Sequence, residues 1–296
     1  MSESYFERND DWALSKIRYL PLRNQEYYEK EDVVDAYDFI GFLNGEHSVK
    51  PSSFFRPTSF QFLEIAKFFG AKRFLDIGCG AGFFRYLLEN HYDQRIKEYQ
   101  GFDISSAQVD RAVKRFGEYF AVKDAGEIAQ EELNRFDAVH VYSVLNFMRP
   151  ERQLTLVDQL LNANGVTFLD FSVTDQKIEF CPTHSFNHLG KMEIDGEIVL
   201  SQIGFCTIDQ IVDIVNKSGK YQMATAEIDF SVACLVNDTA HDGSVQVSKE
   251  SLFANKVLSR KKFGRTTKLK ALNCVIWPKE VDLPTVAVPD DLNIHL

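Results

Sequence analysis

The residues best suited to hold a small ligand form a run of alternating glycines behind an acidic side chain. Asp76, Gly78, Gly80 and Gly82 follow the order D-x-G-x-G-x-G, and the apolar segment 73–77 leads into them. Glycine permits a tight turn with positive φ and lets ligand atoms touch the backbone, and a helix beginning behind the turn offers free N–H groups. The pattern predicts a nucleotide-like ligand at this turn.

The spacing of the glycines separates this turn from other nucleotide sites. Dinucleotide-binding proteins carry G-x-G-x-x-G and place a pyrophosphate on the helix N-terminus. Here the third glycine comes one residue earlier, and the carboxylate of Asp76 stands where it would repel a pyrophosphate. No Lys-Ser or Lys-Thr pair follows the glycines, as it would in a P-loop. A cationic ligand with an ammonium group fits the turn better.

Short apolar strands alternate with amphipathic helices around this turn, which indicates βαβ units and a parallel sheet. We expect strands at 73–77, 99–103, 119–122, 137–142, 165–171, 224–236 and 271–277, with helices at 27–43, 58–69, 82–90, 106–116, 127–133, 151–161 and from Thr207 to Val215. Ser105 with Gln108, and Thr207 with Gln210, have the spacing of capping boxes. His140, in the middle of a strand, is interpreted as a core or supporting residue.

The expected fold is α/β: a doubly wound, mostly parallel seven-stranded sheet whose last strand is antiparallel. An N-terminal helical segment (1–58) precedes one domain (59–296), which carries an insertion (174–204) and a loop (237–270). Within the insertion, 191–201 reads as a β-hairpin that turns at Asp195-Gly196.

Composition limits the class of protein. The 296 residues carry a formal net charge of −10, which disfavours nucleic acid or an anionic membrane as a general partner. No apolar run is long enough to cross a bilayer, and the first residues lack a secretory signal. Five scattered cysteines, without a Cys-x-x-Cys pair, are typical of a reduced compartment. We expect a cytoplasmic protein.

The motifs continue in an order that resembles the class I S-adenosylmethionine-dependent methyltransferases over about residues 59–236. Asp103 closes the second strand and Asp124 follows the third. The segment Phe136–Asn146 matches the family's fourth-strand motif, and Asn164-Gly165 precedes the fifth strand as in the family's usual turn. The resemblance implies a Rossmann-like methyltransferase that uses S-adenosylmethionine.

The resemblance also implies which residues bind this cofactor. Asp76 and the loop from Gly78 to Gly82 would surround the methionine moiety, Asp103 would hold the ribose, and Asp124 with Ala125 the adenine. The full set of expected cofactor-binding residues is Asp76, Gly78, Cys79, Gly80, Gly82, Phe83, Asp103, Ile104, Asp124, Ala125 and Tyr142.

The acceptor site is expected beyond the carboxyl ends of the fourth and fifth strands, with the insertion covering it. If the acceptor is a hydroxyl it needs a base, and His184, His188 or Asp170 are the candidates. Cys181, His184 and His188 could also supply three zinc ligands, but no fourth is evident, so we expect no metal.

The expected reaction is methyl transfer to oxygen or nitrogen of a small-molecule or glycan-type metabolite. A basic run that includes Arg260, Lys261, Lys262 and Arg265 could dock an anionic group of the acceptor. Two alternatives stay open: an RNA methyltransferase that uses this basic run, and a non-catalytic methyltransferase-like scaffold.

Overall fold

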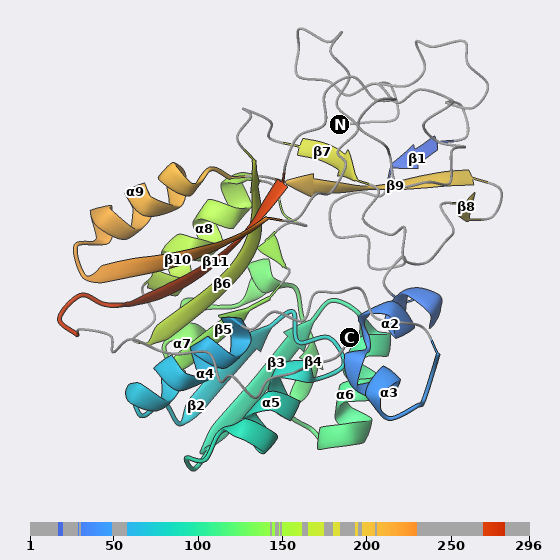
Figure 1. Ribbon diagram of the computed structural model, residues 1–296, viewed down its shortest axis with the longest axis horizontal. Coiled ribbons are helices and arrows are strands. Elements are labelled where there is room, and N and C mark those ends of the chain that lie inside the picture. The colour runs from blue at the N-terminus through green and yellow to red at the C-terminus, as the bar shows by residue number, and fades with distance from the viewer. Residues whose placement is uncertain are drawn as a thin grey trace, which may run out of the picture.

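A computed structural model describes residues 17–19, 29, 31–48, 58–142, 144–145, 148, 150–161, 165–174, 180–183, 193–194, 197–204, 206–229 and 269–281. Its main sheet contains β2 (Arg73–Ile77), β3 (Glu98–Asp103), β4 (Phe120–Val122), β5 (Ala138–Val141), β6 (Val166–Thr174), β10 (Tyr221–Asp229) and β11 (Leu269–Pro278). The strand order is β10-β11-β6-β5-β2-β3-β4 (Figure 1).

The direction of the strands follows the expectation for a doubly wound sheet. β2 pairs in parallel with β3 and β5, and the parallel set extends to β4 and β6. β11 is antiparallel to both of its neighbours, β6 and β10. The mostly parallel seven-stranded sheet with an antiparallel last strand is therefore confirmed.

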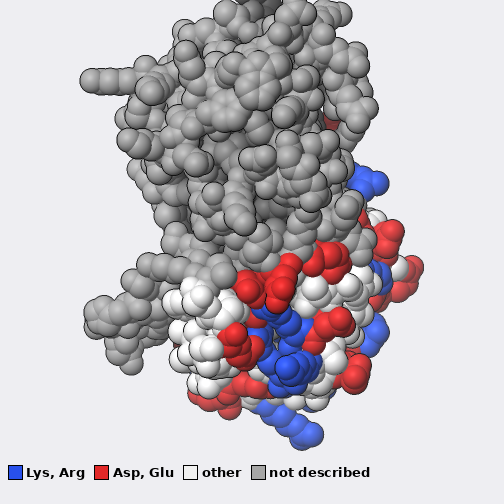
Figure 2. All heavy atoms as spheres, turned by 90° about the vertical axis from the view of Figure 1, so that its right-hand side faces the viewer, with Lys and Arg blue, Asp and Glu red and all other residues white. Residues whose placement is uncertain are grey.

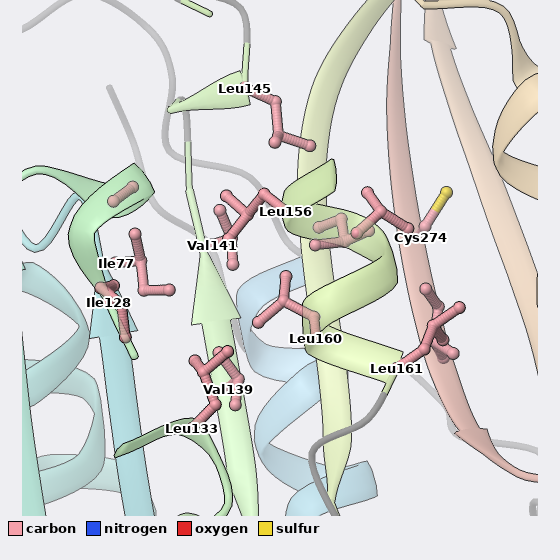
Figure 3. Close-up of a cluster of buried hydrophobic side chains, with 14 of the residues drawn as sticks. Ile77, Ile128, Leu133, Val139, Val141, Leu145, Leu156, Leu160, Leu161 and Cys274 are labelled. Atoms are coloured by element: carbon pink, nitrogen blue, oxygen red, sulfur yellow. The ribbon is translucent and has the colours of Figure 1, made fainter. Parts of the chain in front are cut away.

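Helices cover both faces of this sheet because successive strand residues point to opposite sides. The helices are α4 (Thr58–Phe68), α5 (Phe83–His91), α6 (Ser106–Phe116), α7 (Gln130–Leu133), α8 (Pro150–Leu161) and α9 (Ile208–Ser218). Phe74 and Phe168 pack with α4 and α5 on one face. Leu75 and Leu169 pack on the other, with α8 and α9. Figure 3 shows this second core, in which Val139, Val141 and Leu145 lie beside the leucines of α8.

Several boundaries differ from the sequence expectation. The expected helix 127–133 is a 3-10 turn (Ala125–Glu127) followed by α7, since the side chain of Asp124 caps Gly126 and starts the turn early. The expected helix 27–43 is broken into α2 (Glu31–Tyr37) and α3 (Phe39–Leu43), because Asp38 turns its carboxylate onto the N–H of Gly41 and begins a new helix. The helix 58–69 is confirmed as α4, and Gly70, at φ 62°, ends it.

A second, smaller sheet joins a short strand near the N-terminus with three strands between residues 180 and 204. It contains β1 (Ile17–Tyr19), β7 (Phe180–Thr183), β8 (Glu193–Ile194) and β9 (Glu197–Gly204). β8 and β9 pair antiparallel with Ile194 opposite Glu197, which confirms the hairpin around Asp195-Gly196. β1 pairs in parallel with β9, a contact that the sequence did not indicate. In the view of Figure 1 this sheet lies above the seven-stranded sheet, beyond the end of β6.

Among the described helices, none is long and apolar enough to cross a membrane. Most of the loop 237–270, with its basic run from Arg260 to Arg265, lies outside the described residues. The docking role expected for that run therefore stays a prediction.

Candidate functional site

The glycine turn lies between the end of β2 and the start of α5. Gly78, Gly80 and Gly82 have φ values of 78°, 50° and 92°, which side-chain-bearing residues rarely adopt. The backbone N–H groups of Gly78 and Cys79 donate to the carbonyl oxygen of Phe102, at 2.8 and 3.1 Å, and so tie the turn to the end of β3. The turn is thus held rigidly at the carboxyl edge of the sheet.

The three glycines serve different purposes. A Cβ on Gly78 would lie 2.1 Å from Cγ2 of Val144, and one on Gly82 would lie 2.8 Å from the ring of Phe116. At Gly80 the nearest described atom outside the turn is Oε1 of Gln108, 3.8 Å away. Gly78 and Gly82 therefore let the protein pack closely, whereas Gly80 leaves room for a ligand among the described residues.

The carboxylate of Asp103 is hydrogen-bonded directly to Gly80. Its Oδ2 accepts the N–H of Gly80 at 2.9 Å, and its Oδ1 accepts the N–H of Ser105 at 2.9 Å. Burial raises the pKa of Asp103, although the N–H groups of Ser105 and Gly80 act in the opposite direction. A carboxylate offers about four acceptor positions, and the backbone N–H groups of Gly80, Ser105 and Ile104 act on this one, so a position for a further donor remains. The carboxylate could therefore receive hydroxyl donors of a ligand in front of Gly80.

Asp76 lies one layer deeper, in a buried polar group drawn from three adjacent strands. Its Oδ2 accepts the hydroxyl of Tyr99 on β3 at 2.8 Å. Its Oδ1 lies 2.9 Å from Nδ1 of His140, directly opposite on β5. Asp76 and His140 are 1% and 2% exposed, so both are core residues. The core interpretation of His140 is confirmed.

Aromatic rings enclose the imidazole of His140. Phe84 of α5 stacks on it at 4.1 Å between centroids, and Phe168 lies parallel to it at 5.1 Å. Nε2 has no hydrogen-bond partner among the described residues. Nδ1 therefore carries the proton that the Asp76 carboxylate accepts, and His140 fixes that carboxylate below the glycine turn.

The other residues expected to bind a cofactor come to the same edge of the sheet. Asp124 follows β4 and accepts the N–H of Gly126 at 2.7 Å, beside the buried Ala125. Tyr142 follows β5 and donates its N–H to the carbonyl oxygen of Ile77 at 3.2 Å. Since β2 to β5 are parallel, their carboxyl ends meet here, and the sequence-based set is brought together.

Three neighbours complete that set around the turn. Cys79 is buried, and burial raises the pKa of its thiol well above the usual value. Phe83 starts α5 and meets the ring of Phe39 edge-on at 5.3 Å. Ile104 is half-buried directly after Asp103. All three lie at or beside the glycine turn and Asp103, and the cofactor-binding role expected of them stays a prediction.

Of the three candidate bases, only Asp170 lies among the described residues. Asp170 lies on β6, is 1% exposed, and stands opposite Asn273 in the register with β11. His184 and His188 lie outside the described residues. The described part of the chain holds no group of three His, Cys, Asp or Glu side chains arranged for a metal. The acid/base assignments stay predictions.

The N-terminal helices dock on α6 through charged groups, a contact that sequence reasoning missed. Asp38 is buried and accepts both Nη groups of Arg115 at 2.7 Å and Nη1 of Arg111 at 2.9 Å. Burial, which raises the pKa of Asp38, is outweighed by the hydrogen bonds from Arg115, Gly41 and Arg111, so the pKa is lowered. In Figure 2, acidic and basic side chains lie next to one another on the described part of this side of the molecule.

Glu29 closes the same contact at the start of α6. Its carboxylate accepts the N–H groups of Ser106 and Ala107 at 2.6 and 2.9 Å, and the hydroxyl of Ser106 at 2.9 Å. A carboxylate at this position satisfies free N–H groups and the positive end of the helix. Because α6 begins just behind Asp103, the N-terminal segment is fastened to the edge of the site.

Comparisons with known proteins identify the central part of the chain. Residues 75–167 match the family model of a methyltransferase domain. Every residue expected to bind the cofactor falls within this range, while Asp170, His184 and His188 fall outside it. No curated protein sequence matches the chain.

Comparison with solved structures finds similarity at low sequence identity. A phospholethanolamine N-methyltransferase 2 from Haemonchus contortus, in complex with phosphomonomethylethanolamine and S-adenosylhomocysteine, has a TM-score of 0.50 and 17% identity. That match covers 87% of this chain and 59% of the other. Magnesium protoporphyrin IX methyltransferase from Synechocystis PCC 6803, with bound S-adenosylmethionine, has a TM-score of 0.45 and 13% identity, covering 86% of this chain and 94% of the other.

Proposed function

We propose that this chain, a member of the class I S-adenosylmethionine-dependent methyltransferase superfamily, methylates an oxygen or nitrogen atom of a small-molecule or glycan-type metabolite. The observation that carries the cofactor assignment is the room in front of Gly80, bounded by the Asp103 carboxylate at the carboxyl edge of the sheet. The five scattered cysteines, which are typical of thiols kept in the reduced state, support a cytoplasmic location.

The residues of the site fit this cofactor. Asp103 would accept the ribose hydroxyls, and the glycine turn would lie against the methionine moiety. The negative charge of Asp76, held in place by Tyr99 and His140, suits a cationic ligand. When bound, S-adenosylmethionine supplies an electrophilic methyl group on sulfur, which an acceptor displaces in line.

The protein's contribution to such a displacement is chiefly positioning. The small sheet of β1, β7, β8 and β9 lies beyond the end of β6, where an acceptor would sit, and supports a covered acceptor site. A hydroxyl acceptor must also lose its proton, for which His184, His188 or Asp170 would serve. An amine needs only to arrive unprotonated.

Calorimetry tests the cofactor assignment. Wild-type protein should bind S-adenosylhomocysteine in preference to NAD. Asp103→Ala should weaken binding by about 1.5–3 kcal/mol, since it removes charge-assisted hydrogen bonds to the ribose. Asp137→Ala is the matched control: this carboxylate also accepts two backbone N–H groups, those of Lys72 and Arg73, but at the opposite edge of the sheet. Unchanged binding by a folded Asp103→Ala variant would refute the assignment.

Turnover tests the acceptor half of the proposal. A metabolite extract and labelled cofactor should reveal an acceptor. If that acceptor is a hydroxyl, His184→Ala or His188→Ala, whichever removes the base, should lower single-turnover methylation by roughly 10²-fold, and an amine acceptor should show a smaller loss. The control is His91→Ala, which should leave the rate unchanged. His91 is exposed and lies at the far end of α5. Binding of cofactor without methylation of any extract component would favour the scaffold alternative instead.

A further inference from the structure

Gln108 presents a buried acceptor that no residue in the described part of the chain uses. Its Nε2 donates to the carbonyl oxygen of Val34 on α2 at 3.0 Å. Only the NH₂ end of an amide can donate, so this bond fixes which way the side chain faces. The opposite atom, Oε1, has no hydrogen-bond partner among the described residues, and the residue is 5% exposed. A buried acceptor left unpaired is costly.

The sequence suggested a different use for this side chain, and the structure corrects it. In a complete capping box, the third helical residue accepts the N–H of the cap, as Gln210 does for Thr207 at 2.8 Å. Ser105 caps α6 by accepting the N–H of Gln108, but its own N–H donates to Asp103 instead. Asp103 thus accepts the N–H of Ser105 that Gln108 would accept in a complete capping box, so the side chain of Gln108 is not used as a cap.

The unpaired oxygen faces the room in front of the glycine turn. It lies 3.8 Å from the position that a Cβ on Gly80 would occupy, and no other described atom outside the turn comes within 4 Å of that position. The N–H of Gly80 in turn donates to Oδ2 of Asp103. Two acceptors, one charged and one neutral, therefore border the same space.

We propose that Gln108 is a cofactor-binding residue whose Oε1 accepts a hydrogen bond from a ribose hydroxyl of S-adenosylmethionine, beside Asp103. This inference rests on the proposed function. Vicinal hydroxyls offer two donors, and an amide supplies the second acceptor without adding another negative charge next to Asp103. The Nε2 bond to Val34 also joins α2 to the occupied site, so that the N-terminal segment helps to hold the acceptor in place.

A cycle of protein and ligand variants tests the pairing directly. Calorimetry would compare S-adenosylhomocysteine with its 2′,3′-dideoxy analogue, on wild type and on Gln108→Met, which has a similar volume but replaces the amide by a thioether, a much weaker acceptor. With the hydroxylated ligand, Gln108→Met should bind roughly tenfold more weakly. With the dideoxy analogue the two proteins should bind alike, because the hydroxyl that Gln108 would recognise is gone.

Gln153 provides a matched control for loss of a buried glutamine. Its Nε2 donates to the carbonyl oxygen of Met148 at 3.0 Å, and its Oε1 likewise has no partner among the described residues. Gln153 lies on α8, however, whose leucines pack on the other face of the sheet. Gln153→Met should change thermal stability and leave cofactor affinity unchanged. If Gln108→Met does not fold, the side-chain amide resonance of Gln108 in wild type gives the same information: it should shift with S-adenosylhomocysteine and stay in place with the analogue.

The outcomes separate this inference from the proposed function. Equal loss for both ligands on Gln108→Met, no loss at all, or an amide resonance that responds equally to both ligands overturns the role of Gln108 while leaving the methyltransferase assignment intact. Failure of wild type to bind S-adenosylhomocysteine overturns both.

Discussion

Replacing Asp38 with asparagine should weaken the contact between the N-terminal helices and α6 more than any nearby change. The side chain of Asp38 is 0% exposed. It accepts four hydrogen bonds: Oδ2 from Arg111 and Arg115 at 2.9 and 2.7 Å, and Oδ1 from Arg115 and Gly41 at 2.7 and 2.9 Å. Asparagine keeps only one acceptor oxygen. Its NH₂ group replaces the other oxygen and places donor hydrogens against the guanidinium donors of the arginines.

The magnitude follows from the burial of the partners. Removing one member of a buried ion pair costs about 3–5 kcal/mol, because the other charge is left uncompensated. The side chains of Arg111 and Arg115 are 27% and 12% exposed, so water recovers part of that loss. We therefore expect Asp38→Asn to lower the free energy of unfolding by about 3 kcal/mol, at the low end of that range.

Urea denaturation followed by circular dichroism measures this difference, provided that the slope against urea is unchanged. Asp35→Asn is the control, since Asp35 accepts one hydrogen bond from Arg111 at 2.6 Å and its side chain is 16% exposed. It should cost about 1 kcal/mol. Losses of equal size in the two variants, or a loss below about 1 kcal/mol for Asp38→Asn, would show that the buried network does not hold these helices as argued.

Three further outcomes follow from the structure. Gly82→Ala should cost about 2–4 kcal/mol in urea denaturation, because its Cβ would lie 2.8 Å from the Phe116 ring at a φ of 92°; a loss under about 0.5 kcal/mol would contradict this. The pKa values of Asp38 and Asp137 are lowered in the folded protein. The stabilisation that these carboxylates give is therefore present above the unfolded pKa of about 3.9 and is lost as pH falls through the folded values. Urea midpoints that stay constant as the pH is lowered from about 6 to 2.5 would refute this. Burial raises the pKa of Cys206 to about 12, so iodoacetamide at pH 8 should label this thiol only after unfolding, and peptide mapping that finds it labelled in native protein would exclude the burial.

Local patterns in the sequence were sufficient to locate the glycine turn and the strand ends around it. The alternation of strands and helices predicted the parallel sheet, and in such a sheet Asp76, Asp103, Asp124 and Tyr142 must meet at one edge. The glycine spacing and the alternation of strands and helices are local patterns, so the sequence indicates them directly.

Contacts set by strand order or by docking were beyond reach of the sequence. The bond between Asp76 and His140 requires that β2 and β5 be neighbours in a fixed register, and no local motif encodes this. The role of Gln108 was misread because its spacing from Ser105 is that of a capping box, while Asp103 occupies the competing position. The sequence shows an excess of acidic residues before residue 50 and two arginines in α6, but it does not show that these groups pair.

The parallel pairing of β1 with β9 sets an order in time. Ile17 must wait for Ile198 to be synthesised before the two can pair. At typical elongation rates of 5–20 residues per second, this interval lasts roughly 10–35 s. During it the five parallel strands around the glycine turn can already be complete, since they end at Thr174. A nascent chain would thus complete the sheet edge that carries the glycine turn before the small sheet forms, and β1 would remain available to chaperones until β9 emerges.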